Sequence, residues 1–329
     1  MRGFVRELPG LSTLMRHALV FAHFDPHDVV DPHVLYALAC YRPYFESIVF
    51  VSTSDLDRKQ QARVAALADC VIVRNNVGYD FLSWRAGFEA IPNHRIFDSI
   101  AFTNDSCYGP ICDFRAFWQR SANFGADLWG ASINRQIRPH VQSFFMVFQS
   151  TLIRSGFARS FWTSVENVND KMQVILRYEV GLSQRVEEAG FRIGAMVDYL
   201  AGGLDSRQRV VADTVSLTDP GRSDIGLISV RNERFPNPVQ NYCVESLRRG
   251  LPFVKVELIR DNFARANLMA VFAAMTEPRW YDISMINSHL SRLSPCGNFP
   301  PAPSRTNAGL KEDPASWGEE VTASNRSFP

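Results

Sequence analysis

The sequence predicts a doubly wound α/β fold built on a mostly parallel sheet, and two observations lead to this prediction. Short apolar, β-branched runs such as residues 70–73 alternate with helical patterns of about ten residues. Polar loops follow such runs directly, as at residues 74–80 and 104–110. Continuous apolar strands are typical of parallel sheets covered on both faces. Because open α/β sheets bind ligands at the carboxyl ends of their strands, these loops are the expected binding site.

The first 110 residues contain the clearest alternation. Asp31 and Pro32 suit the N-cap and the first position of a helix, and Pro92 closes the helix that begins near Phe81. From the apolar spacing we expect strands at residues 17–25, 47–53, 70–73 and 99–103, and helices at residues 31–41, 57–67 and 81–91.

The pattern continues beyond residue 110 with less regular spacing. Helices are expected at residues 114–123, 170–189 and 239–249, strands at residues 126–131, 140–148 and 225–230, and a further helix broken at Gly156. Gly181 lies inside the longest helix, where glycine costs about 1 kcal/mol relative to alanine. We therefore expect a local break or a close backbone approach at this glycine.

These elements divide the chain into four parts. A first domain is expected at residues 1–204, and the polar, poorly periodic residues 205–224 are expected to form a linker. A smaller C-terminal α/β subdomain would occupy residues 225–293 and pack on the first domain. Residues 294–329 are rich in proline, serine, asparagine and glycine, and we expect a disordered tail there.

The amino-acid composition and net charge exclude several classes of protein function. The 329 residues are 46% hydrophobic and 21% charged, which is typical of a soluble globular protein. A net charge of +1 argues against nucleic-acid binding, which requires many neutralised phosphates. No apolar run approaches the roughly 18 residues that span a bilayer, and residues 1–16 lack the apolar core of a secretory signal. The six cysteines are scattered without a zinc-site pattern, which favours reduced thiols and a cytoplasmic protein.

Two stretches at the predicted site resemble signature sequences of the rhamnan synthesis protein F family. They are Arg74-Asn75-Asn76-Val77-Gly78-Tyr79-Asp80 and the run from Phe102 to Pro110. Residues 178–183 and 237–257 resemble the same family, so that the resemblance covers roughly residues 18–262. More loosely, the two stretches are similar to GT-A nucleotide-sugar transferases, which have an asparagine–glycine loop before a helix and an acidic residue ending a strand.

This resemblance implies a glycosyltransferase of bacterial surface polysaccharide assembly, with residues 1–204 as a GT-A-like catalytic domain. It implies inverting transfer of a sugar, rhamnose being the family's case, from a dTDP-rhamnose-like donor. The acceptor would be a glycan or lipid-linked glycan of a rhamnan, O-antigen or capsule. The protein would be cytoplasmic, at most peripherally attached to the inner face of the membrane. The alternative is a non-catalytic GT-A-like binding or scaffold protein in polysaccharide assembly.

Asp105 is the candidate residue for binding the diphosphate group of the nucleotide-sugar donor. GT-A enzymes commonly carry two aspartates one residue apart, which bind Mg²⁺ or Mn²⁺ through oxygen atoms. Here the sequence is Thr103-Asn104-Asp105, so only the second aspartate is present and a tightly held metal is in doubt. The alternative is that Asp105 shapes the turn that follows it.

The other candidates follow from the same resemblance. Donor contacts are assigned to the loop residues Arg74, Asn76, Gly78 and Asp80, to Asn104 beside Asp105, and to His23 and Asp25 at the end of the first strand. Asp80 could instead cap its helix, Arg74 could be a solvated surface charge, and His23 with Asp25 could cap the strand.

Glu179 is the candidate general base, because burial among apolar neighbours would raise the pKa of its carboxyl group. The alternative is an ion pair with Arg177 or Arg185. His140 is the second candidate base, and a structural histidine is its alternative.

Overall fold

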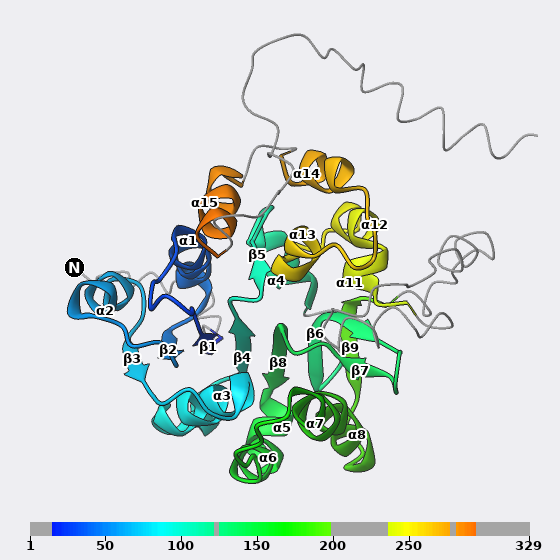
Figure 1. Ribbon diagram of the computed structural model, residues 1–329. Helices are drawn as coiled ribbons and strands as arrows, with labels where there is room; N and C mark the ends of the chain where they lie inside the picture. Colours follow the sequence, from blue (N-terminus) through cyan, green and yellow to red (C-terminus); the bar gives the residue numbers. More distant parts are fainter. Residues whose placement is uncertain (1–14, 122–124, 199–235, 277–280, 294–329) are drawn as a thin grey trace, which may run out of the picture.

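The computed structural model describes residues 15–121, 125–198, 236–276 and 281–293, and its centre is one eight-stranded sheet (Figure 1). The strands follow one another along the sheet in the order β3, β2, β1, β4, β8, β6 and β7, and β9 pairs with β6. Their bounds are β1 His17–His23, β2 Ser47–Ser52, β3 Cys70–Val73, β4 Ser99–Asn104, β6 Leu128–Asn134, β7 His140–Val141, β8 Phe145–Gln149 and β9 Ile193–Val197.

The strand order reverses between β1 and β4. The chain moves outward from β1 to β2 and β3, and then returns to place β4 on the other side of β1, with all four strands parallel. Among the described strands of this sheet, β8 and β7 run antiparallel to their neighbours. The predicted doubly wound, mostly parallel sheet is therefore confirmed. Such a reversal leaves a crevice at the carboxyl ends of the two strands, where Ala22 of β1 is in register with Asn104 of β4.

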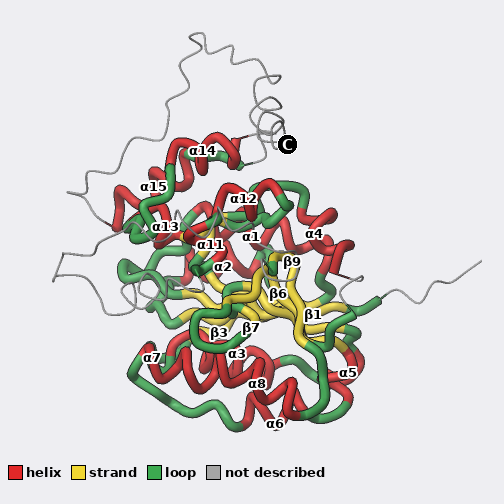
Figure 2. The backbone as a smooth tube through the Cα atoms, turned by 90° about the vertical axis from the view of Figure 1, so that its right-hand side faces the viewer, coloured by secondary structure: helices red, strands yellow, loops and turns green. Residues whose placement is uncertain are grey.

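Helices cover both faces of the sheet, as Figure 2 shows. One face packs against α3 (Tyr79–Ala90), α5 (Ser150–Arg154), α6 (Phe157–Thr163), α7 (Lys171–Val174) and α8 (Gly181–Glu188). The other face packs against α1 (Pro32–Tyr41), α2 (Arg58–Ala65) and α4 (Phe114–Ser121). Two short 3₁₀ helices, η1 (Arg42–Tyr44) and η2 (His94–Ile96), precede β2 and β4.

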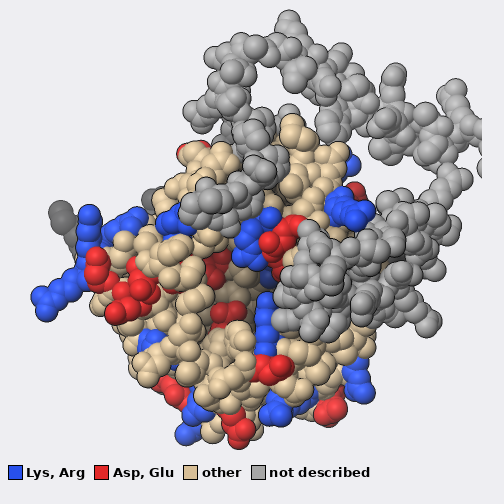
Figure 3. All heavy atoms as spheres, in the orientation of Figure 1, with Lys and Arg blue, Asp and Glu red and all other residues tan. Residues whose placement is uncertain are grey.

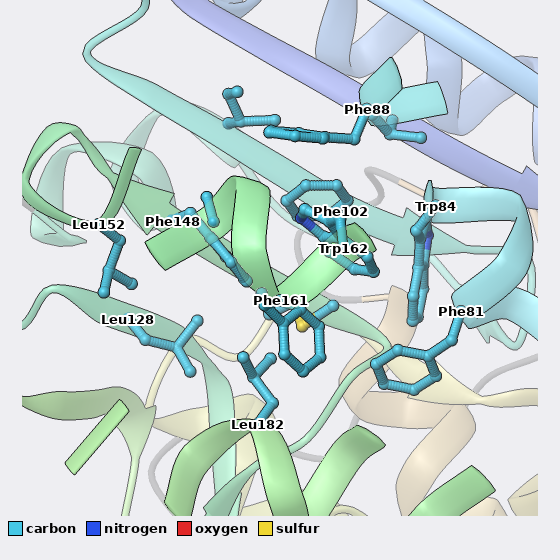
Figure 4. Packing of buried hydrophobic residues seen from close by; sticks show 14 of the residues in the cluster. Phe81, Trp84, Phe88, Phe102, Leu128, Phe148, Leu152, Phe161, Trp162 and Leu182 are labelled. Atoms are coloured by element: carbon cyan, nitrogen blue, oxygen red, sulfur yellow. The ribbon is translucent and has the colours of Figure 1, made fainter. Parts of the chain in front are cut away.

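Each core is built by alternate residues of the same strands. Ala18, Val20 and Ala22 of β1 face the first helix layer, whereas Leu19 and Phe21 face the second. Figure 4 shows the first core, in which aromatic side chains of α3, α6 and the strands pack together; those labelled are Phe81, Trp84, Phe88, Phe102, Phe148, Phe161 and Trp162. Burial on both faces explains why the central strands β1, β2 and β4 are mostly apolar.

Three predicted elements are interrupted. The helix expected at residues 239–249 is divided at Tyr242 into α11 (Pro238–Asn241) and α12 (Cys243–Arg248). The strand expected at residues 140–148 is split into β7 and β8, because Gln142 bonds to Ser132 while Thr103 Oγ1 donates to the Phe144 carbonyl. The helix expected at residues 170–189 contains a π-helical turn, η3 (Ile175–Val180), which ends immediately before Gly181. The expected local break is thus confirmed. Strand β9 was not expected from the sequence.

The described C-terminal part is mostly helical, and its helices are α11 (Pro238–Asn241), α12 (Cys243–Arg248), α13 (Val256–Arg260), α14 (Leu268–Thr276) and α15 (Ser284–Leu293). One short strand, β10 (Val254–Lys255), pairs antiparallel with β5 (Cys107–Tyr108), directly after β4. The C-terminal part is thereby placed over the carboxyl end of β4. The predicted linker at residues 205–224, strand at 225–230 and tail at 294–329 lie outside the described residues.

Candidate functional site

Two cavities lie at the carboxyl ends of the strands. The first, of about 330 Å³, is lined by the β1 and β4 loops, α13 and α15, and we call it the switch-point cavity. The second, of about 290 Å³, is lined by α3, the β6–β7 segment, η3 and α11, and we call it the helix-side cavity. Ser106, Lys171, Lys255 and Glu257 line both, so the cavities share one wall. Figure 3 shows the hollow, with acidic side chains inside it and basic side chains beside it.

Asp105 lies in the switch-point cavity at the strand-order reversal. Its Oδ2 accepts the Phe24 N–H at 2.8 Å, which ties β4 to the loop after β1. Burial and the nearby Asp80 carboxylate raise the pKa of Asp105 well above its ordinary value. The turn-forming role belongs instead to Asn104, whose Oδ1 accepts from the Ser106 amide and hydroxyl groups at 3.2 and 2.6 Å.

Asp80 lies in the helix-side cavity and is joined to Asn104. The Asn104 Nδ2 donates to Asp80 Oδ2 at 2.8 Å. Burial raises the pKa of Asp80, against the lowering effect of Asn104 and of Lys255 and Lys171. The helix N-cap is Gly78, with no side-chain cap bond, so the structure does not use Asp80 as an N-cap. Asp80, Asn104 and Asp105 are therefore brought together by the fold.

Two lysines that sequence reasoning missed stand between the cavities. Lys255 Nζ donates to Ser106 Oγ at 3.0 Å and lies 4.6 Å from the centre of the Phe144 ring. The β10–β5 pairing puts Lys255 opposite Cys107, two residues after Asp105. Lys171 is exposed at the start of α7 and lines both cavities. No local pattern marks Lys255, because the long-range pairing of β10 with β5 brings it to the site.

Glu179 lies in η3 and lines the helix-side cavity, where it is half-buried. Its Oε1 accepts the Ser143 N–H at 2.9 Å. The alternative ion pair is not formed among the described residues: Arg185 donates to Ser164 Oγ at 3.1 Å and lies over the Phe161 ring, and no ion pair of Glu179 is present there. The carboxylate is thus held at the cavity by one backbone amide.

His140 lines the same cavity as Glu179 and is 3% exposed. Its Nδ1 lies 2.7 Å from the Arg138 carbonyl oxygen. Because a carbonyl can only accept, we assign the proton to Nδ1, which leaves Nε2 as the basic nitrogen. The structure therefore brings both candidate bases to one cavity, on different elements.

His23 and Asp25 line the switch-point cavity. His23 Nδ1 bonds to Ser52 Oγ at 2.9 Å, and burial lowers the pKa of this imidazole to about 4, so it is neutral. The Asp25 carboxylate accepts from Arg292 of α15 and from the amides of His27 and Val29. Burial acts to raise the pKa of Asp25, but these donors together lower it. Asp25 thus anchors α15 to the first βα loop.

The remaining predicted donor residues line neither cavity. Arg74 donates to Ser83 Oγ at 2.9 Å and to the Val77 carbonyl at 2.7 Å, so it fastens the loop before α3. Gly78 has φ +69°, and an added Cβ would lie 2.2 Å from Leu82 Cδ1, so glycine is required for the turn into α3. Asn76 is exposed. These three residues shape the loop that presents Asp80.

The fold is that of an α/β protein with a mostly parallel sheet, and acidic and basic side chains line two cavities at its strand-order reversal. The model of the family described as rhamnan synthesis protein F matches residues 48–216, slightly more than half of the chain. The chain belongs to this family.

Two curated relatives are similar over part of their length. Virulence protein VirA of Vibrio anguillarum is 27% identical over 201 residues, which cover 59% of this chain and 63% of VirA. The uncharacterized protein y4gN of Sinorhizobium fredii is 27% identical over 154 residues, which cover 45% of this chain and 40% of that protein. The chain thus spans less than two thirds of either relative.

Solved structures match more distantly. A cytidylyltransferase from Leptospira borgpetersenii has a TM-score of 0.35 and 12% identity, covering 67% of this chain and 95% of its own. Mouse xyloside xylosyltransferase 1 has a TM-score of 0.28 and 13% identity, covering 54% and 76%. These scores are too low to carry an argument, so the fold class rests on the strand order. Within the described residues, no helix has the length and apolarity that a membrane span requires.

Proposed function

We propose that this protein is a nucleotide-sugar-dependent glycosyltransferase of bacterial surface polysaccharide synthesis. Membership of the rhamnan synthesis protein F family supports a role in polysaccharide synthesis, and one structural observation supports glycosyl transfer as the reaction. Two cavities meet at a wall that carries Lys171 and Lys255, with Asp105 on one side and the candidate bases on the other. A two-substrate transfer needs such a division between donor and acceptor.

The donor diphosphate would bind in the switch-point cavity. Lys255 and Lys171 would neutralise the charge that develops on the leaving diphosphate. A Mg²⁺ or Mn²⁺ ion fits Asp105, because such ions are commonly held by one or two carboxylates together with substrate phosphates and water. When bound, the ion would supply further positive charge to the diphosphate.

The acceptor would bind in the helix-side cavity. Tyr79 and Ile137 line it and are each 43% exposed, so they offer apolar surface to the face of a sugar ring. Tyr79 also has φ +53°, which is unusual for a residue other than glycine and is often found at functional sites.

Transfer would then be a single inverting displacement. The acceptor oxygen forms a bond to the anomeric carbon as the bond from that carbon to the diphosphate oxygen breaks. The hydroxyl proton passes to Glu179 or to His140 Nε2, and the bond electrons leave with the diphosphate. Rhamnose is the sugar that the family name suggests.

One observation favours the alternative of a non-catalytic binding or scaffold protein. Thr103 occupies the position of the missing first aspartate, and its hydroxyl group donates to the Phe144 carbonyl at 2.7 Å. A hydroxyl group held in this way adds no negative charge for a metal.

A binding experiment tests the donor site. We expect nucleoside diphosphates and their sugars to raise the melting temperature of the protein, because a ligand of the folded state stabilises it by mass action. Lys255→Gln should reduce this shift, whereas Lys59→Gln, at an exposed position in α2, should leave it unchanged. Equal shifts in both variants would contradict the assignment of the diphosphate to the shared wall.

A further inference from the structure

A buried cluster of two histidines and one aspartate lines the switch-point cavity and contains none of the residues assigned to transfer. Asp31 is the N-cap of α1, His33 lies in its first turn, and His289 belongs to α15. The ring centres of His33 and His289 are 4.4 Å apart, and His289 Nε2 is 3.7 Å from Asp31 Oδ2. One nitrogen or oxygen atom from each of the three lies within 4.8 Å of the others.

The ring of His33 packs against Tyr108 and His289, but this packing does not account for its two polar nitrogens. His33 is 3% exposed, and neither ring nitrogen has a hydrogen-bond partner among the described residues. Buried polar atoms are almost always bonded, so an imidazole with both nitrogens unpartnered indicates a missing ligand.

We propose that Asp31, His33 and His289 bind a zinc ion. Two imidazole nitrogens and one carboxylate oxygen are a ligand set that zinc accepts, whereas Mg²⁺ and Mn²⁺ prefer oxygen atoms. Zinc holds its ligands at about 2.0–2.2 Å, so binding requires small side-chain rotations that draw the three ligand atoms closer together. All three residues line the switch-point cavity, so the fourth coordination position opens toward it.

The surroundings of the cluster suit this ion. Tyr108 Oη lies 2.8 Å from His289 Nδ1, so with the metal on Nε2 the Nδ1–H would donate to the phenol oxygen. Arg292 contacts both Asp31 and Asp25, and one guanidinium leaves the two carboxylates with an excess negative charge. The ion would join α15 to α1 and so fix the C-terminal helix against the cavity.

Metal titration of the purified, chelator-treated protein tests the proposal. We expect one zinc ion per chain, a higher melting temperature with zinc, and with Co²⁺ the intense visible absorption of a four-coordinate site. His33→Ala and His289→Ala should abolish all three. His94→Ala, at a histidine before β4 and away from the cluster, should keep them.

Tyr108→Phe keeps the ring and removes only the outer partner, and it should weaken zinc binding by about 10–100-fold. If His33→Ala fails to fold, Tyr108→Phe and the titration of the wild type still test whether zinc binds at this cluster. No zinc uptake by the wild type, a weak six-coordinate Co²⁺ spectrum, or a His289→Ala variant that binds as the wild type does would overturn the proposal.

Discussion

At the residue scale, Glu179 and His140 reach one cavity from different elements and are held by different bonds. Glu179 accepts a backbone amide, which glutamine could also do, so Glu179→Gln should keep the fold and remove only the base. If Glu179 is the base, kcat should fall by about 10²–10⁴-fold while donor binding is unchanged. The kcat, the donor affinity and the melting temperature of the variant are to be measured together.

Two outcomes would remove Glu179 from the reaction. A lower melting temperature with normal turnover of the folded fraction would make it a structural residue. Unchanged kcat at an unchanged melting temperature would do the same. In either case His140→Asn should produce the loss of kcat instead.

Asp105 gives a second residue-scale prediction. Asp105→Asn keeps an oxygen that can accept the Phe24 N–H, so the fold should survive. Transfer should be abolished, and nucleotide affinity should no longer depend on divalent ions. The check is nucleotide binding and transfer with Mn²⁺ and with EDTA. Equal wild-type activity in both would contradict the metal and leave Lys255 and Lys171 as the counter-charge.

The sequence could indicate those site residues that stand beside strand ends or inside a recognisable stretch. Asp80, Asn104 and Asp105 meet as expected, because parallel strands end at one edge of the sheet. Lys255 could not be found in this way, since it arrives through a pairing with β5 that no local pattern encodes. The same holds for His289, which contacts His33 although the two residues are 256 positions apart in the sequence.

At the scale of the element, strands that are continuous apolar runs were predictable, and strands modified by polar contacts were not. Residues 70–73 form a strand with the predicted bounds. The polar residues on either side of these four apolar residues fix where the strand begins and ends. The break between β7 and β8 depends on bonds from Ser132, Thr103 and Glu179, which come from three other elements.

Gly87 tests how closely α3 packs on the sheet. An added Cβ would lie 2.2 Å from Val20 Cγ1 and 3.1 Å from Val51 Cγ2. Helix propensity alone would make Gly87→Ala stabilising by about 1 kcal/mol. Overpacking typically costs about 1–3 kcal/mol, so we expect a net loss of stability. Thermal or urea unfolding of the variant measures the sign, and a gain in stability would contradict the packing described here.

At the scale of the whole molecule, stability should fall in acid. The pKa of His23 is lowered from 6.5 to about 4 by burial, so between these values the unfolded chain binds a proton that the folded protein does not. The free energy of unfolding therefore decreases as the pH falls from about 6.5 to 4. His23→Asn should show a shallower decrease in urea titrations across this range. Identical slopes would show that His23 is protonated in the folded protein.

The central claim is that the two cavities together perform sugar transfer, and turnover of a nucleotide-sugar tests it most directly. Purified protein is to be incubated with a panel of nucleotide-sugars, with and without Mn²⁺, and release of free nucleoside diphosphate followed. We predict release from at least one donor, even slowly by hydrolysis, and its loss in Lys255→Gln but not in Lys59→Gln. Binding of a nucleotide-sugar with no release, with and without glycan acceptors, would contradict the claim and leave a binding protein.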